Sequence, residues 1–408
     1  MLNKGQKIKV AFILGYPNPS PDASWTRISF FAKKFLEKGY DVSVFGAFTP
    51  KSLSLAGFRQ WEGIPIYNII PSIQVYNGVV FILEAFLTTF LLPITFLIVK
   101  PKVVIISLPE GEPALGSFIA SRLAHSKVVF DIRDEWEDYQ LQKSLSIISK
   151  RAYELIKMLM SSLYIKADLV VTVTEKVAKS LKVRGVTKIK VVPNGADINV
   201  FRPYEKNITR KKLGLKAKDF IIVYEGGVGG YYRLDVVVKA LAKLDNEIKD
   251  KIKLLIIGYG KISNILRLAE ELGLSNTVIY FGKEYNKSRL ARIISSGDVG
   301  IIPYDNNPLW KNSVPAKFYE YCACGLPVIA TVYDDSSLAG IIEEHQIGLT
   351  TPPMDENKLS EAITWLYRNM QLRETMGMRA RKLIEEKFDR NKIADDFLKL
   401  IEGILSDE

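Results

Sequence analysis

The chain is predicted to be an α/β protein with two doubly wound parallel-sheet domains, on three observations. Short continuous apolar runs, typical of strands buried on both faces, alternate with amphipathic helical stretches. This alternation starts again after a polar, turn-rich segment at residues 193–213. The length of 408 residues exceeds one ordinary core and suits two domains.

The first domain is expected at residues 1–203. Its first strand is the apolar run at 8–14, which a Pro-rich loop and an amphipathic helix at 26–38 follow. Gly39 ends that helix. The later strands are expected at 41–45, 103–107, 128–132, 169–172 and 190–192.

The second domain is expected at residues 204–387. Apolar runs with glycines and helical stretches after them predict its strands. These runs lie at 220–224, 253–257, 278–281, 299–302 and 327–330. The final stretch, 388–408, contains an amphipathic helix that we expect to pack back on the first domain.

The composition is that of a globular enzyme, with 48% apolar and 25% charged residues. The start of the chain lacks the apolar core and cleavage site of a signal peptide. Cys322 and Cys324 point in divergent directions on a helix, so we expect no disulfide and a cytoplasmic location. With His125 and His345 as the two histidines, we expect no metal site.

The positive charge is concentrated in the first half. Residues 1–203 carry 26 Lys and Arg against 16 Asp and Glu, whereas residues 204–408 carry 30 against 29. We interpret this as contact with an anionic partner, either anionic lipid or a phosphorylated acceptor. A solvated Lys-rich surface is the alternative. No nucleic-acid-binding signature is present, so nucleic acid is not an expected partner.

Residues 79–99 form an apolar stretch with one charge, Glu84. The stretch is long enough to span a bilayer, but strands of one sheet precede and follow it and Pro93 would kink it. We predict a helix that lies in the membrane interface, or a shallow re-entrant element. A fully buried helix is the alternative.

Two glycine-rich turns are predicted at the carboxyl ends of strands in the second domain. Gly226 and Gly227 follow one strand, and Gly258 and Gly260 follow the next. Glycine lets backbone N–H groups approach a diphosphate, although tight turns also need glycine. Neither turn has the spacing of an ATP-binding loop.

The segment at 312–330 carries the strongest candidate site. Pro315 is expected to open a helix that places Lys317 and Glu320 on one face. A cation there can hold a diphosphate, and a carboxylate can accept two ribose hydroxyls.

This segment resembles the donor-site helix of the retaining family 4 glycosyltransferases, which reads P-x-K-x-x-E-Y-x-A-x-G-x-P-V-I-A. Further similarities cover nearly the whole chain. They are Val192-Pro-Asn-Gly-Ala-Asp197, Ile257-Gly-Tyr-Gly260, Asp298-Val-Gly-Ile-Ile-Pro-Tyr304 and Asp131-Ile-Arg-Asp-Glu-Trp136.

The resemblance implies the two-domain GT-B fold, with the donor on the second domain and the acceptor on the first. It places Glu320 on the donor ribose and Lys317 near the diphosphate. The loop at 15–27, Glu110, Arg133 and Asp134 would face the acceptor.

Four positions depart from the family pattern, one of them Arg133, which stands where many members carry a histidine before the acceptor-site Asp. Asn312 stands where many members have a glutamate that touches the donor sugar, so Asn312 or Ser313 would bind hydroxyls instead. Gly227 and Tyr232 stand where many members carry Arg and Lys. Residues implied to meet the donor and its charge are therefore Tyr304, Lys317, Arg233, Lys261 and Arg133.

We therefore predict metal-independent, retaining transfer of a sugar from a UDP- or GDP-linked donor, with no other cofactor. The acceptor is expected to be a lipid-linked saccharide or surface glycan at the inner face of the cell membrane. Asp134 or a donor phosphate oxygen would take the acceptor proton. The alternatives are an epimerase acting on a UDP-sugar and a membrane-bound scaffold without activity.

Overall fold

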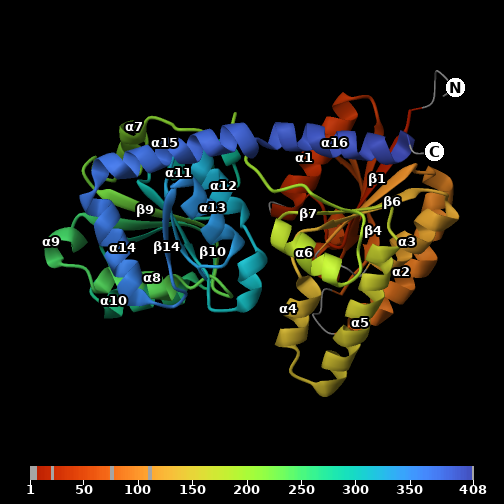
Figure 1. Ribbon diagram of the computed structural model, residues 1–408, viewed down its shortest axis with the longest axis horizontal. Helices are drawn as coiled ribbons and strands as arrows, with labels where there is room; N and C mark the ends of the chain where they lie inside the picture. The colour runs from red at the N-terminus through yellow and green to blue at the C-terminus, as the bar shows by residue number, and fades with distance from the viewer. Residues whose placement is uncertain (1–6, 20–22, 74–77, 109–112, 407–408) are drawn as a thin grey trace. The chain divides into compact units, whose positions relative to one another are not determined.

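A computed structural model describes residues 7–19, 23–73, 78–108 and 113–406. The chain forms two compact units, one of Met1–Pro193 with Asn391–Glu408 and one of Asn194–Arg390 (Figure 1). Each unit has a mainly parallel sheet with helices on both faces. The predicted pair of Rossmann-like, doubly wound domains is confirmed.

The first unit contains an eight-stranded sheet in the order β3-β4-β2-β1-β5-β6-β7-β8. All neighbouring strands are parallel except β3, which pairs antiparallel with β4. Neither β3 nor β4 was predicted. The strands are β1 Lys9–Leu14, β2 Asp41–Phe48, β3 Gly57–Trp61, β4 Ile64–Pro71, β5 Val103–Ser107, β6 Lys127–Ile132, β7 Leu169–Thr172 and β8 Ile189–Val191.

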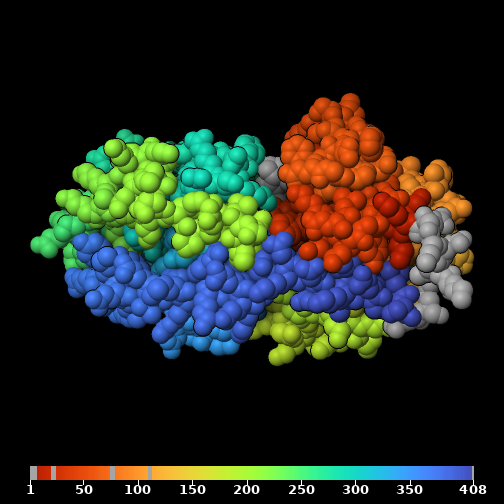
Figure 2. All heavy atoms as spheres, turned by 90° about the horizontal axis from the view of Figure 1, so that it is seen from above, coloured from red at the N-terminus to blue at the C-terminus, as the bar shows by residue number. Residues whose placement is uncertain are grey.

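Helices α1 (Ala23–Glu37) and α16 (Arg390–Ser406) cover one face of this sheet. Phe31 of α1 stacks on Phe397 of α16, and Figures 1 and 2 both show α16 along the N-terminal segment. The opposite face carries α2 (Gly78–Val99), α3 (Ala114–Leu123), α5 (Ile147–Ile165) and α6 (Glu175–Val183). The short helices η1 (Pro50–Leu55) and α4 (Trp136–Lys143) lie between these elements in sequence.

The polarity of α2 is reversed relative to an ordinary surface helix. Its polar residues Glu84 and Thr88 are buried, and the Glu84 carboxylate accepts a hydrogen bond from the backbone N–H of Ile73. Its outward side chains are apolar and 44–75% exposed. They are Val79, Ile82, Leu83, Phe86, Leu87, Phe90, Ile94, Leu97 and Ile98.

This exposure shows that the alternative of a fully buried helix is wrong. By length and composition α2 is the one helix of the described residues that could cross a membrane, and 28% of its most apolar window is buried. It joins β4 to β5 of the same sheet and packs on α3, so it lies on the surface of the first unit.

The second unit contains a six-stranded sheet in the order β11-β10-β9-β12-β13-β14, in which every neighbouring pair is parallel. The strands are β9 Phe220–Val228, β10 Ile252–Gly260, β11 Val278–Gly282, β12 Val299–Pro303, β13 Val328–Thr331 and β14 Gly348–Thr351.

One face of this sheet packs against α8 (Leu234–Ala242), α9 (Asn246–Lys249), α10 (Ile262–Glu271) and α14 (Glu356–Arg368). The other face packs against α11 (Lys287–Ser295), α12 (Ala316–Ala323), α13 (Ser337–His345) and α15 (Met370–Lys387). The remaining short helices are α7 (Lys206–Lys212) and η2 (Pro308–Asn312).

The units divide at positions that differ from the predicted boundaries at 203/204 and 387/388. The observed divisions follow Pro193 and Arg390. The reason is that residues just after Pro193 belong to the second core. Ala196 pairs with Asp389, and both Ala196 and Phe201 are buried against α12 and α15.

We expect Gly116→Ala to lower the free energy of unfolding by about 1–3 kcal/mol. A Cβ on Gly116 of α3 would lie 2.5 Å from the carbonyl carbon of Thr88, so α2 would have to move away. The matched control is Gly403→Ala in α16, where a Cβ meets nothing within 4 Å and helix propensity adds up to about 1 kcal/mol. Urea unfolding measures both. Equal stability of the two variants would contradict the close packing of α2 on α3.

Candidate active site

The carboxyl ends of β9, β10 and β12 meet at one edge of the second sheet and build the candidate site. Gly226 pairs with Gly258 and Val228 pairs with Gly260, so the glycines lie within the last three residues of paired strands. The prediction of separate glycine turns was wrong in this respect. A Cβ on Gly258 would lie 1.8 Å from the Gly226 oxygen, and a Cβ on Gly260 would lie 2.3 Å from the Val228 oxygen. Close strand pairing therefore requires glycine at both positions.

Lys317 lies in the first turn of α12, which Pro315 precedes as its N-cap. Lys317 is only 5% exposed, and its Nζ lies 3.6 Å from the ring centroid of Tyr232 and 4.2 Å from that of Tyr224. Within the described part of the chain, this buried Nζ has no hydrogen-bond acceptor. A Cβ at Gly226 would lie 2.8 Å from the Nζ, so glycine leaves the space that the lysine occupies.

Three ionisable side chains influence one another here. Burial lowers the pKa of Lys317 to about 8, although Glu225 and Glu320 oppose this shift. Burial, with help from Glu225, raises the pKa of Glu320 to about 7. Burial also raises the pKa of Glu225. The site therefore holds Lys317 and Glu320, whose pKa values lie close to neutral pH, beside Glu225, whose pKa burial raises.

A wall of aromatic rings leads outward from Lys317. Tyr232 stacks on Tyr304 with 5.2 Å between centroids, and Tyr304 stacks on Trp310 at 5.5 Å. Tyr231 packs on Trp310 at 4.4 Å. Tyr304 is buried, whereas Tyr231, Tyr232 and Trp310 are half-buried. The wall offers flat faces on which a planar base or a sugar ring can stack.

The other predicted site residues of the second unit differ in their exposure and in whether their charge is paired. Asn312 ends η2 and Ser313 follows it, both half-buried just before α12. Arg233 forms an ion pair with Asp235 at 2.6 Å, so its charge is already balanced. Lys261 is exposed at the start of α10 and forms no ion pair with any residue that the structure describes.

Arg133 and Asp134 follow β6 in the first unit. The Nε of Arg133 donates a hydrogen bond to the Leu108 carbonyl at 2.5 Å. Burial raises the pKa of Asp134 to about 6, against the lowering effect of Arg133. The buried Oδ1 of Asp134 has no hydrogen-bond partner among the described residues. Glu110 lies outside them.

Arg27 does not face a ligand, contrary to our expectation for the loop at 15–27. Its guanidinium is buried and forms an ion pair with Asp131 at 2.9 Å. It also donates hydrogen bonds to the carbonyls of Val192 and Pro193. Arg27 therefore ties α1 to β6 and to the last residues of the first unit.

Sequence reasoning missed Glu225 and the role of the tyrosines. Glu225 follows the apolar run of β9 directly and precedes the glycines, which was the available signal. Tyr232 was noted only as a departure from the family pattern. The structure shows that its ring lies against the Lys317 ammonium.

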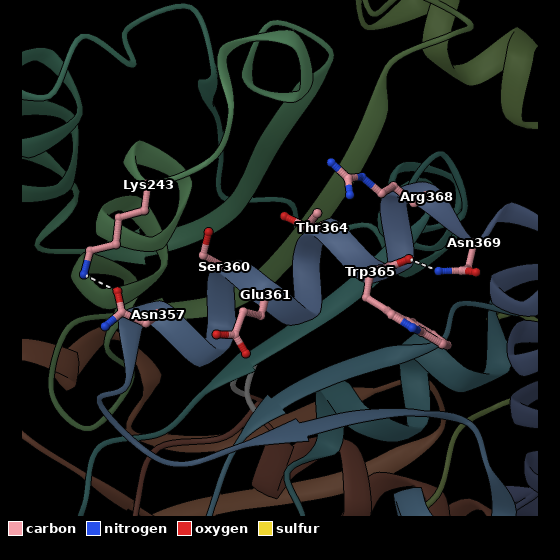
Figure 3. Close-up of a pocket in the computed structure, with 8 residues that line it drawn as sticks. All are labelled: Lys243, Asn357, Ser360, Glu361, Thr364, Trp365, Arg368 and Asn369. Atoms are coloured by element: carbon pink, nitrogen blue, oxygen red, sulfur yellow. Dashed lines mark hydrogen bonds between the residues drawn. The ribbon is translucent and has the colours of Figure 1, made fainter.

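A polar pocket lies elsewhere in the second unit, along α14 (Figure 3). None of the predicted site residues lines it. Its lining residues are Lys243, Asn357, Ser360, Glu361, Thr364, Trp365, Arg368 and Asn369. Within the described residues, no group of three or more His, Cys, Asp or Glu side chains could hold a metal ion.

Two family models match the chain. The model "Glycosyltransferase Family 4" matches residues 26–200, and "Glycosyl transferases group 1" matches residues 205–383. The fold and these matches define the protein as a glycosyltransferase with the GT-B fold. The chain belongs to the group 1, family 4 type of glycosyltransferases, as the sequence motifs predicted.

Individual relatives are distant. An uncharacterised glycosyltransferase of Methanocaldococcus jannaschii is 22% identical over 98% of this chain and 100% of its own length. The N-acetyl-alpha-D-glucosaminyl L-malate synthase of Bacillus anthracis is 25% identical over 54% of this chain and 55% of its own. The structure of Anabaena HepE in complex with UDP and glucose has a TM-score of 0.73 and 16% identity, and it covers 97% of this chain and 100% of that one.

We expect the Nζ of Lys317 to lose its proton as the pH rises through about 8, well below the range of an exposed lysine. Lysine side-chain nitrogen NMR of the labelled protein measures this titration. Glu225→Gln should lower the pKa further, because Glu225 favours the charged lysine. Lys317→Met assigns the signal, and titration near pH 10.5 would contradict the burial described here.

Proposed function

We propose that the protein transfers a glycosyl group from a UDP- or GDP-linked sugar to a membrane-associated acceptor and retains the anomeric configuration. The observation that carries the donor part is the buried ammonium of Lys317, which has no hydrogen-bond acceptor among the described residues. A buried ammonium without a hydrogen-bond acceptor is costly, and a bound diphosphate would supply that acceptor.

The surroundings of Lys317 support a diphosphate as the ligand. The end of β9 brings Gly226 close to the lysine, with Gly227 next in the strand, and glycine backbone can approach phosphate oxygens closely. Anabaena HepE, a protein of similar fold, has been crystallised with UDP and glucose. The exposed Lys261 is a second cation that a flexible phosphate could reach.

Glu320 is the proposed ribose ligand. It lies three residues after Lys317 on one side of α12, and its carboxylate can accept hydrogen bonds from two adjacent hydroxyls. Because its pKa is about 7, the ionised acceptor form is populated at and above neutral pH. Asn312 and Ser313 are the proposed contacts of the donor sugar, and Tyr304 belongs to the aromatic wall beside them.

In the proposed reaction, the bond between the anomeric carbon and the donor diphosphate breaks, and a bond to an acceptor oxygen forms on the same face. The acceptor proton goes to a donor phosphate oxygen or to Asp134. The carboxyl of Asp134, with a pKa of about 6, is ionised at neutral pH and can take it. Lys317 and glycine N–H groups would stabilise the charge on the leaving diphosphate, which is the main catalytic contribution. This proposal needs no metal ion.

The reversed polarity of α2 supports a membrane-associated acceptor. A helix on a water-exposed surface normally turns its polar side outward, whereas α2 buries Glu84 and Thr88 and exposes Phe86 and Phe90. The net positive charge of the first half favours an anionic surface, such as the inner face of the cell membrane. A lipid-linked saccharide or a surface glycan is the acceptor class that fits this location.

The donor site is tested by thermal unfolding in the presence of UDP, GDP, ADP or dTDP. We expect one diphosphate to raise the melting temperature of the wild type and to leave Glu320→Ala unchanged, because the ribose loses its acceptor. The control Glu270→Ala, at an exposed position of α10, should respond as the wild type does. No shift with any diphosphate would contradict the donor site and favour an inactive scaffold.

The proposed membrane binding through α2 is tested by flotation with phospholipid vesicles. We expect the triple variant Phe86→Ser, Phe90→Ser, Ile94→Ser to lose at least about ten-fold in vesicle affinity, since it removes exposed apolar area. Phe96 is unsuitable because it is fully buried.

The matched control replaces three exposed apolar side chains of α15, Met370, Leu372 and Met378, with serine. This control should float as the wild type does. Equal flotation of the α2 variant and the wild type would refute the role of α2 in membrane binding.

A further inference from the structure

A second apolar surface of the first unit lies on α5 and the turn before it. Leu145, Ile147 and Ile148 are 104%, 81% and 72% exposed. Three exposed large apolar side chains within four residues are unusual on a water-exposed turn, where polar residues and glycine normally prevail.

The outward face of α5 continues this surface. Leu155, Met158 and Ile165 are exposed on the same side of the helix as Ile147, while Tyr153 belongs to the opposite side, packed in the core. Like α2, α5 therefore has apolar side chains on both its inner and its outer face. An ordinary sheet-covering helix needs only the inner stripe.

The position of α5 relates it to α2 and to the candidate acceptor residues. Because α5 leads into β7, it begins at the edge where the parallel strands of the first sheet end. Asp134 follows β6 at this same edge. At the start of α2, Phe81 stacks on Trp136 of α4 with 5.5 Å between ring centroids. Figure 1 shows α4 and α5 extending together from the sheet of the first unit.

The charges around the turn are positive. Residues 139–153 contain Lys143, Lys150 and Arg151 and no acidic residue. The ammonium of Lys143 lies 4.1 Å from the ring centroid of Tyr139, and Arg151 pairs with Glu154 at 2.9 Å. An apolar tip with cations beside it has the chemistry of a segment that inserts between anionic lipid headgroups.

We propose that the turn at 143–148 and the outer face of α5 form a second membrane contact, whose partner is a bilayer containing anionic phospholipid. Leu145, Ile147 and Ile148 insert below the headgroups, and Lys143, Lys150 and Arg151 lie at the lipid phosphates. The inference rests on the membrane-associated function proposed above. With α2 as the other contact, it turns the sheet edge that carries Asp134 toward the bilayer, where a lipid-linked acceptor presents its hydroxyl or phosphate.

The test measures the affinity of the full chain for vesicles of phosphatidylcholine alone and of phosphatidylcholine with phosphatidylglycerol. We expect Leu145→Ser, Ile147→Ser, Ile148→Ser to weaken binding to both kinds of vesicle at least about ten-fold. Lys143→Gln, Lys150→Gln, Arg151→Gln should weaken binding by up to about 100-fold, and only to the vesicles with phosphatidylglycerol. Circular dichroism and melting temperatures confirm that both variants are folded.

An insertion readout is independent of affinity. A polarity-sensitive fluorophore on Ile148→Cys should shift to the blue on vesicle binding, whereas the same label on Met378→Cys of α15 should not. The two native cysteines, Cys322 and Cys324, are buried in the second unit and provide a low labelling background.

The outcomes separate this inference from the proposed function. If the α2 variant is released while both turn variants bind as the wild type does and Ile148 shows no shift, the second contact is refuted and α2 remains the membrane contact. If the wild type binds neither kind of vesicle, the second contact and the proposed membrane role of α2 are both refuted. A wild-type dimer that the serine variant converts to a monomer would instead assign the turn to a second copy of the chain.

Discussion

Parallel strand pairing is the constraint on which the rest of the structure depends. Strands that run in one direction end at one edge, and helices must cover both faces to bury their apolar side chains. In the second unit this brings the ends of β9, β10 and β12 together with the start of α12. Gly226, Tyr304 and Lys317, which are far apart in sequence, therefore meet in one small region.

The electrostatics of that region differ from the pattern of many family members. Tyr232 stands where they carry a cation, and its ring contacts the Lys317 ammonium at 3.6 Å. The quadrupole of an aromatic ring favours a nearby cation, so the tyrosine helps to hold a charge that burial disfavours. Glu225 and Glu320 also favour the charged form of Lys317, because they oppose the lowering of its pKa by burial.

The first unit has an ordinary apolar core, but it also exposes many apolar side chains on its surface. Its sheet is covered by apolar packing on both faces, as in other α/β domains, and it contains the buried Arg27–Asp131 ion pair. The outer face of α2 is instead apolar, and α2 places its one carboxylate, Glu84, against the protein, while α5 exposes apolar side chains beside charged ones. Such a surface is compatible with lipid, because a lipid environment removes the cost of exposing apolar side chains.

The sequence by itself determined the two doubly wound units, most strands and the positions of Lys317 and Glu320, because continuous apolar runs and the helix spacing are local signals. It did not reveal β3, β4 and β14 or the division after Pro193, because these depend on how each segment packs against the rest of its unit. It also did not reveal the ion pair of Arg233 with Asp235, which depends on the side-chain conformations in the folded unit. The tertiary structure alone decided that the half-buried Glu225 acts on the charge of Lys317 and that the polar side of α2 faces inward. Burial and orientation arise from what packs against a helix or strand, and no local pattern of residues encodes that.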